Sequence, residues 1–178
     1  MAEEKKEPWL NYLALSTVIL AVCATLATFK AGGYSTRSVL SQTQASDQWA
    51  YFQSKSIKGY LYEMNKEKLE LEQKATGGKG QPGRSAEYEK LIADYGSKIA
   101  KYDDEKKRIQ AEAKRFERVR DDAQRHGQAF GIAVIFLQIA ILLSSIAALL
   151  KQKLVWFLGV AIGMGGIVSF INGFMLFF

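Results

Sequence analysis

Three stretches of this sequence contain no charged side chain, and they restrict the possible folds more than any other feature. They run from Pro8 to Phe29, from Gly127 to Leu150 and from Leu154 to Phe178. Each is about as long as the ~20 apolar residues that an α-helix needs to cross the hydrocarbon core of a bilayer. A chain with three such stretches is expected to be an integral membrane protein.

We predict transmembrane helices over residues 9–29, 130–150 and 154–178, preceded by a short N-terminal tail, residues 1–8. Only residues 151–153 separate the second helix from the third, so these two helices should form a tight antiparallel pair. A cleaved signal peptide is the alternative for the first stretch. Its apolar run is longer than the usual ~7–15 residues, however, and acidic residues precede it.

The segment between the first two stretches, residues 30–129, holds most of the charged side chains and also a seven-residue apolar repeat. Such a repeat is how a long helix lays one seam along a partner helix. We expect a helix over residues 85–127, with Ser85 as its N-cap. Its seam consists of Tyr88, Ile92, Tyr95, Ile99, Tyr102, Lys106, Ile109, Ala113, Phe116, Arg120 and Ala123.

Residues 35–74 contain no Pro and one Gly, which favours a second long helix. Two lines with seven-residue spacing are expected to form its seam. The first is Thr43, Ala50, Ile57, Met64 and Leu71, and the second, more polar line is Val39, Ser46, Gln53, Tyr60 and Glu67.

Residues 75–84 are rich in Gly and contain Pro, and so form a loop. The predicted fold is all-α: three transmembrane helices and, outside the membrane, an antiparallel coiled-coil hairpin over residues 30–129. Gly32 and Gly33 predict a bend or a short break between the first membrane span and the hairpin.

Several features point to a homo-oligomer. The first hairpin helix carries Gln, Ser and aromatic side chains on more sides than one partner helix can cover. In the third span, small residues recur on one stripe, which lets helices approach closely. Two amides in the spans would seek partners across helices. The candidate contacts are Gly159, Gly163, Gly166, Gly173, Gln138 and Asn172; packing within one chain is the alternative.

The formal net charge of +6 is spread along the chain, and its basic clusters are diluted by acidic residues. Nucleic-acid binding needs a basic stripe without such neutralisation, so we do not expect it. Lipid headgroups are the expected neighbours of these charges.

The location expected for this chain is a bacterial inner membrane. Lys residues in the short N-terminal segment and in the 151–153 turn favour the cytoplasm for both, because short loops follow their Lys and Arg content. The long hairpin then lies in the periplasm.

The segment from Leu40 to Lys55, with its Thr43-Gln44-Ala45-Ser46-Asp47 run and Trp49, resembles the most recognisable part of a bacterial membrane-protein family known only as a domain of unknown function. The resemblance covers essentially the whole chain. It implies one early span, a Lys/Glu-rich helical middle and a terminal span pair, and it implies no activity. It directs attention to Gln44, Asp47, Trp49, Phe52 and Lys55, as residues that set helix register or contact another subunit.

No motif for catalysis or cofactor binding occurs in the sequence, which lacks a P-loop, GxGxxG, nucleophile elbow or HExxH pattern. The single histidine, His126, and the single cysteine, Cys23, cannot supply a metal cluster. We expect no enzyme activity, no metal and no cofactor.

The function expected from these features is structural. The chain would oligomerise and present its helical arms as a scaffold for another envelope protein. A second hypothesis is an oligomeric pore or a transport accessory, lined by Ser16, Thr17, Thr25, Thr28 or Gln138. A third is a signal-transmitting rod with hinges at Gly32 and Gly33.

Overall fold

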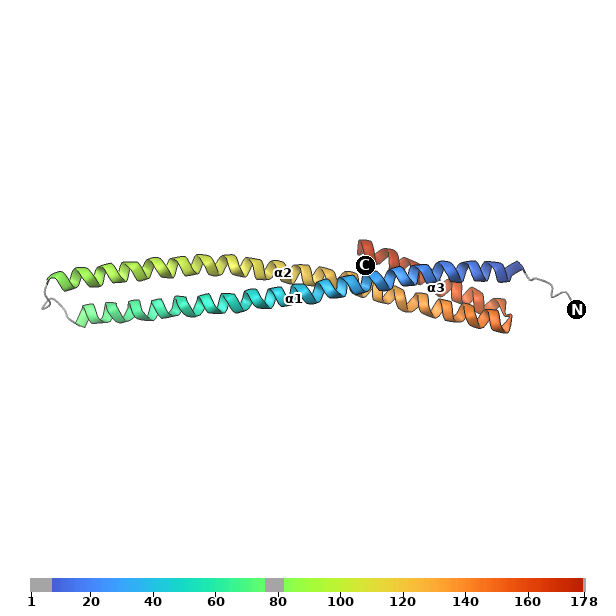
Figure 1. Ribbon diagram of the computed structural model, residues 1–178, viewed down its shortest axis with the longest axis horizontal. Coiled ribbons are helices and arrows are strands. Elements are labelled where there is room, and N and C mark those ends of the chain that lie inside the picture. Colours follow the sequence, from blue (N-terminus) through green and yellow to red (C-terminus); the bar gives the residue numbers. More distant parts are fainter. Residues whose placement is uncertain (1–7, 76–81, 178) are drawn as a thin grey trace, which may run out of the picture. The chain divides into compact units, whose positions relative to one another are not determined.

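The computed structural model describes residues 8–75 and 82–177, and every described element is an α-helix (Figure 1). The helices are α1 (Pro8–Ala75), α2 (Pro82–Leu150) and α3 (Lys153–Met175). The all-α prediction is therefore confirmed. Each helix contains a stretch that is long enough and apolar enough to cross a membrane, judged by length and composition.

The helix boundaries differ from the predicted ones, because helices expected to be separate are continuous. The break predicted at Gly32 and Gly33 is wrong, since α1 passes through both. Two glycines cost about 1 kcal/mol each in a helix interior, which a long, cooperatively formed helix can absorb. Likewise α2 runs without interruption from the charged segment through Gly127 to Leu150.

α2 begins at Pro82 and not at Ser85, so Ser85 is no N-cap. Proline is tolerated in the first turn of a helix, where its missing N–H would have no partner in any case. The predicted N-terminal tail, except Pro8, lies outside the described residues, and so does most of the predicted 75–84 loop.

The chain divides into two compact units. We call residues up to Leu40 together with those from Val119 the three-helix unit, and Ser41–Arg118 the hairpin unit. α1 and α2 contribute to both units, whereas α3 belongs to the three-helix unit alone.

In the hairpin unit, α1 and α2 pair antiparallel (Figure 1). Trp49 contacts Glu117, Lys55 contacts Glu105 and Tyr62 contacts Tyr95, so the partner numbers fall along α2 as they rise along α1. The seam predicted for α2 agrees with burial: every one of its positions from Tyr88 to Phe116 is buried or half-buried.

The seam predicted for α1 is wrong. The residues that face α2 are more polar, and one of their two lines lies two positions before the predicted apolar line while the other lies one position before the predicted polar line. They are Ser41, Ala45, Gln48, Phe52, Lys55, Gly59, Tyr62, Lys66, Leu69 and Gln73, all buried or half-buried. Two residues turn an α-helix by about 200°. The predicted apolar line therefore lies on the opposite face, where Ile57, Met64 and Leu71 are 60%, 66% and 66% exposed.

The three-helix unit packs small residues of α3 against large ones of α1 and α2. A Cβ on Gly163 would lie 2.9 Å from Leu20, one on Gly166 2.8 Å from Leu137, and one on Gly173 2.7 Å from Phe130. Phe130 is fully buried and meets Phe170 and Phe174 edge-on. The remaining core residues are Trp9, Leu13, Leu20, Ala24, Ala27, Ala133, Leu137, Ala140 and Ala147.

The connection from α2 to α3 consists of two residues, Lys151 and Gln152. Lys151 adopts the left-handed conformation (φ 52°), and the N–H of Gln152 donates to the carbonyl of Ala147 at 3.1 Å. This six-to-one bond across a left-handed residue is the Schellman arrangement that ends many helices. It reverses the chain directly into α3.

Gly173→Ala should destabilise the three-helix unit, because the added methyl group would lie 2.7 Å from the buried ring of Phe130. Overpacking of this kind costs about 1–3 kcal/mol. Gly165→Ala on the same helix is the matched control, since nothing lies within 4 Å of the added methyl group. Thermal unfolding of the purified chain in detergent should show a lower midpoint for Gly173→Ala only. Equal midpoints for the two variants would contradict the packing described here.

Candidate functional site

Two places bring polar side chains together: the interhelical seam of the hairpin unit and a cavity between α2 and α3 in the three-helix unit. The seam contains three of the five residues that the sequence singled out between Gln44 and Lys55. The cavity contains Asn172, which the sequence also singled out. Each place is described separately.

Trp49 and Phe52 anchor one part of the seam. Both rings are half-buried and meet edge-on, with centroids 5.5 Å apart. The indole Nε1–H of Trp49 donates to Oε1 of Glu117 on α2 at 2.8 Å. A half-buried indole needs such an acceptor, and a charged one gives a stronger hydrogen bond. This bond fixes the position of α1 along α2.

Lys55 forms the second polar contact of the seam. Its Nζ lies 2.6 Å from Oε2 of Glu105, and the two side chains are only 16% and 28% exposed. The ammonium group also lies 5.2 Å and 5.5 Å from the ring centroids of Tyr51 and Tyr102, a cation–π arrangement. Hydrogen bonding to Glu105, and then to Tyr51, raises the pKa of Lys55. The same contact with Lys55 lowers the pKa of Glu105.

Tyrosines fill the seam beyond Lys55. Tyr62 of α1 stacks on Tyr102 of α2 with centroids 5.7 Å apart and also contacts Tyr95. Gly59 lies beside Tyr102: a Cβ at Gly59 would be 3.8 Å from the Cβ of Tyr102. The small residue therefore lets the two backbones come close, and the large rings fill the space on either side.

The seam is suited to setting the register of the two helices. Trp49 and Lys55 contact α2 of their own chain, and Phe52 is half-buried beside Trp49. Gln44 and Asp47, by contrast, are exposed. The five residues thus fall into two groups, three within the seam and two on the surface of α1.

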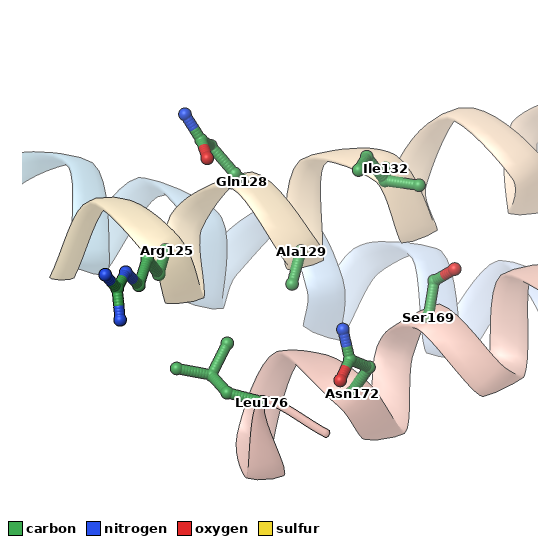
Figure 2. Close-up of a pocket in the computed structure, with 7 residues that line it drawn as sticks. All are labelled: Arg125, Gln128, Ala129, Ile132, Ser169, Asn172 and Leu176. Atoms are coloured by element: carbon green, nitrogen blue, oxygen red, sulfur yellow. The ribbon is translucent and has the colours of Figure 1, made fainter. Parts of the chain in front are cut away.

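The second place is a cavity of about 440 Å³ between α2 and α3 (Figure 2). We call it the Arg125 cavity. Arg125, Gln128, Ser169 and Asn172 supply its polar lining, and Ala129, Ile132 and Leu176 its apolar lining. Asn172 is 4% exposed, and its Oδ1 accepts the backbone N–H of Phe177 at 2.7 Å. This bond caps the end of α3, where Leu176 takes the left-handed conformation.

His126 ties α2 to α3 beside this cavity. Its Nδ1 lies 2.7 Å from the carbonyl oxygen of Gly173, so Nδ1–H donates to that oxygen. Its ring stacks on Tyr34 of α1 with centroids 4.7 Å apart. His126 thus joins all three helices and has a structural role.

The structure places most of the candidate span residues inside the three-helix unit. Gly159, Gly163, Gly166 and Gly173 are buried against α1 and α2 of the same chain. Asn172 is buried and caps its own helix. All five residues are buried within their own chain, as the within-chain alternative expects. Gln138 is exposed on α2 and makes no hydrogen bond with any described residue.

Sequence reasoning missed the acidic partners Glu105 and Glu117, and it missed Arg125. Glu105 and Glu117 lie beside the seam positions of α2 in a strongly charged segment, so nothing in the sequence distinguishes them from other surface carboxylates. Arg125 has a weak signal, since it is the last charged residue before the uncharged stretch that ends at Leu150. Within the described residues, no group of three or more His, Cys, Asp or Glu side chains is placed to hold a metal ion.

Acid should destabilise the hairpin unit through Glu105. Its pKa is lowered in the folded chain, so its contribution is complete above the unfolded-state pKa and is lost as pH falls through the lowered value. Lys55, whose pKa is raised, contributes fully below its ordinary value of 10.5 and loses that contribution only as pH rises through the raised value. Glu105→Gln should therefore reduce the fall in unfolding midpoint, followed by circular dichroism, between about pH 7 and pH 3.

Glu89→Gln is the control for this experiment, because Glu89 is an exposed carboxylate of the same helix outside the seam. It should keep the full acid dependence of the parent chain. If the unfolding midpoints of Glu105→Gln and Glu89→Gln fall equally as the pH is lowered, the contact between Lys55 and Glu105 does not stabilise the hairpin unit.

Comparison with known proteins gives one match. The profile of a family described as a domain of unknown function, DUF4337, matches residues 9–176. No curated protein and no solved structure matches the chain. The matched residues include all three helices and both polar sites, apart from the first residue of α1 and Phe177. The chain therefore belongs to the DUF4337 family of domains of unknown function.

Proposed function

We propose that this protein is a structural membrane protein of the bacterial inner membrane. Its three apolar helical stretches anchor it in the bilayer, and its hairpin unit associates with a second copy. The pair of hairpins then serves as a scaffold for another envelope protein. The observation that carries the proposal is the exposed apolar line on the outer face of α1.

Anchoring in a membrane is supported by the surface of the three-helix unit. Large apolar side chains there are half exposed or more, among them Leu15, Leu26, Ile135, Leu142 and Leu154. Soluble monomers rarely expose so much contiguous apolar surface. The hydroxyls in the same stretches donate to carbonyls of their own helix, as Thr25 does to Ala21 and Ser145 to Ile141, both at 2.9 Å. Such bonds are the way that polar side chains are tolerated in a bilayer.

We define the outer stripe as Ile57, Tyr60, Leu61, Met64 and Leu71. Their side chains are 53–66% exposed, and Ile57, Met64 and Leu71 repeat at seven-residue spacing. Full burial of one such side chain is worth about 1.5–3 kcal/mol. A hairpin acting alone would gain by turning this line toward α2, but α1 turns its polar seam inward instead. A line kept outside in this way fits a second helix partner.

A second copy is the occupant that matches the outer stripe best. The hairpin units of two copies in one membrane lie on the same side of that membrane, so their α1 helices run parallel. In a parallel pair, each residue of the outer stripe meets the same residue of the other copy. In a parallel pair, Glu63 of one copy faces Lys68 of the other, the five-residue offset at which opposite charges attract across a coiled coil. Among the described residues of α2 in the hairpin unit, Leu91 is the only exposed large apolar side chain, and at 37% it is less exposed than any residue of the stripe.

The alternative functions have less support. For a pore, Ser16, Thr17, Thr25 and Thr28 already bond to carbonyls of their own helix, which leaves Gln138 as the exposed candidate for a lumen. For a signalling rod, the expected hinge at Gly32 and Gly33 lies inside a continuous helix. Solute flux through liposomes that contain the pure protein would favour the pore over the scaffold.

Disulfide crosslinking in native membranes tests the proposal. In a Cys23→Ala background, Met64→Cys should give a covalent dimer on oxidation, because the parallel pair places the two sulfurs opposite each other. Leu91→Cys, exposed on α2 away from the stripe, is the control and should remain monomeric. Adding Ile57→Lys to Met64→Cys should reduce the dimer at least about tenfold, the loss expected from about 1.4 kcal/mol of association energy.

A monomer-only result for Met64→Cys, in protein that fractionates with membranes, would contradict the second copy as occupant. Recovery of the chain in the soluble fraction would contradict the anchoring. The Met64→Cys variant also tests orientation: a membrane-impermeant maleimide should label it in cells with a permeabilised outer membrane if the hairpin unit is periplasmic, and should fail to label it if the unit is cytoplasmic.

A further inference from the structure

The Arg125 cavity combines a guanidinium group that has no acidic partner with an apolar wall. Of the two carboxylates nearest to Arg125 in sequence, Asp121 pairs with Arg120 at 2.7 Å, and Asp122 lies beside His126, with its Oδ1 4.0 Å from Nε2. No described carboxylate lies within ion-pair distance of Arg125. An unpaired guanidinium that lines a cavity is suited to bind an anion.

Hydrogen-bonding side chains line the same cavity. Ser169 and Asn172 come from α3, and Figure 2 shows Ser169 across from Ile132 of α2, with Asn172 between Ser169 and the end of the cavity where Arg125 lies. The Oδ1 of Asn172 is held by Phe177, and Figure 2 shows its amide nitrogen on the side that faces α2. The amide of Gln128 points away from Asn172 in the same view, so Gln128 contributes the stem of its side chain. The guanidinium of Arg125 therefore supplies the charge at one end of the cavity, and the hydroxyl of Ser169 lies toward the other end, below Ile132 (Figure 2).

The end of α3 carries negative partial charge, which by itself would repel an anion. Two of the carbonyls responsible are already occupied: that of Asn172 accepts the N–H of Leu176, and that of Gly173 accepts from His126, both at 2.7 Å. Lys30 adds a second positive charge near this end, with its Nζ 5.7 Å from the ring centroid of Phe174. The balance of charge around the cavity is positive.

The apolar wall lies along the direction of the uncharged stretch of α2. Arg125 is the last charged residue before that stretch, and Ile132 lies seven residues further on, about 10 Å along the helix. If α2 spans a membrane, the guanidinium lies at the level of the headgroups and Ile132 among the upper acyl chains. A ligand that fits both ends has a phosphate group joined to a hydrocarbon.

We propose that the Arg125 cavity binds the phosphate group of a phospholipid. Arg125 pairs with the phosphate oxygens, and the first acyl carbons lie against Ala129 and Ile132. The lipid assignment rests on the proposed membrane function. A soluble phosphate ester shares the headgroup chemistry, so the experiment must separate the two sources.

The test uses the purified full-length chain, stripped of lipid in a neutral detergent, and native mass spectrometry with three probes. Dioleoyl-phosphatidylglycerol has both phosphate and tails, dioleoylglycerol has the tails alone, and glycerol 3-phosphate has the phosphate alone. Phosphatidylglycerol should bind one molecule per chain, at least about tenfold more tightly than either of the others. Arg125→Gln should weaken that binding about tenfold or more, the loss expected from one charge-assisted pair.

Arg37→Gln is the matched control, because Arg37 is an exposed arginine of the same unit that does not line the cavity. It removes the same charge and should leave phosphatidylglycerol binding unchanged. Ile132→Trp is a second variant that fills the apolar end and keeps Arg125. It should weaken phosphatidylglycerol binding and leave glycerol 3-phosphate binding as it is.

Each other outcome overturns part of the proposal. If Arg125→Gln and Arg37→Gln weaken phosphatidylglycerol binding equally, the lipid is attracted to positive charge in general and the cavity is not a specific site. Equal binding of dioleoylglycerol would remove the role of the phosphate. Tight binding of glycerol 3-phosphate would keep the phosphate site and overturn the lipid as its source. The glycerol 3-phosphate result does not depend on where the chain fractionates, so failure of the proposed membrane function and failure of the phosphate site remain distinguishable.

Discussion

The hairpin unit depends on which face α1 turns toward α2. The face it turns carries polar and charged side chains, and α2 supplies a partner for the two that are most costly to bury: Glu117 for the indole of Trp49 and Glu105 for the ammonium of Lys55. A half-buried donor without an acceptor would cost about 1–3 kcal/mol. Because such pairs form at only one alignment, they fix the register of the helices as well as the face. The tyrosines and Gly59 then fill the same seam with close contacts.

The three-helix unit is held together by a different kind of fit. Leu137 packs against the backbone of Gly166, and Phe130 packs against that of Gly173. Both contacts are so close that a methyl group added to either glycine would clash. Such close helix packing is expected inside a membrane. Lipid tails are as apolar as the side chains, so helices there associate through tight van der Waals contact and not through burial from water. The two units thus use the two kinds of packing that suit their proposed surroundings: polar pairs and ring stacking in the hairpin unit, and backbone proximity in the three-helix unit.

Much of the fold could be predicted from the sequence, because uncharged stretches and heptad spacing are strong signals. The seam of α2 was predictable since Tyr, Ile and Ala dominate it. The seam of α1 was not, because the more apolar of its seven-residue lines, with Ile57 and Met64, faces outward and the seam itself contains Lys55 and Lys66. A seven-residue repeat identifies which residues share one face of a helix, but it does not identify the helix against which that face packs. Likewise the glycine stripe of α3 predicted close helix packing, but the sequence did not identify Leu137 and Phe130 as the residues that pack there. The cavity that Arg125 lines could be recognised only once the fold had placed α3 along α2.

The choice of face in the hairpin unit can be measured directly with an engineered disulfide. A Cβ at Gly59 lies 3.8 Å from that of Tyr102, the mean separation found in disulfides. In a Cys23→Ala background, Gly59→Cys with Tyr102→Cys should oxidise to an intrachain disulfide, seen as faster migration on a non-reducing gel. Ile57→Cys with Tyr102→Cys should not, because two residues turn α1 by about 200°. A disulfide in the Ile57 pair and none in the Gly59 pair would mean that the apolar line faces α2, and it would contradict both the seam described here and the outer stripe proposed to join two copies.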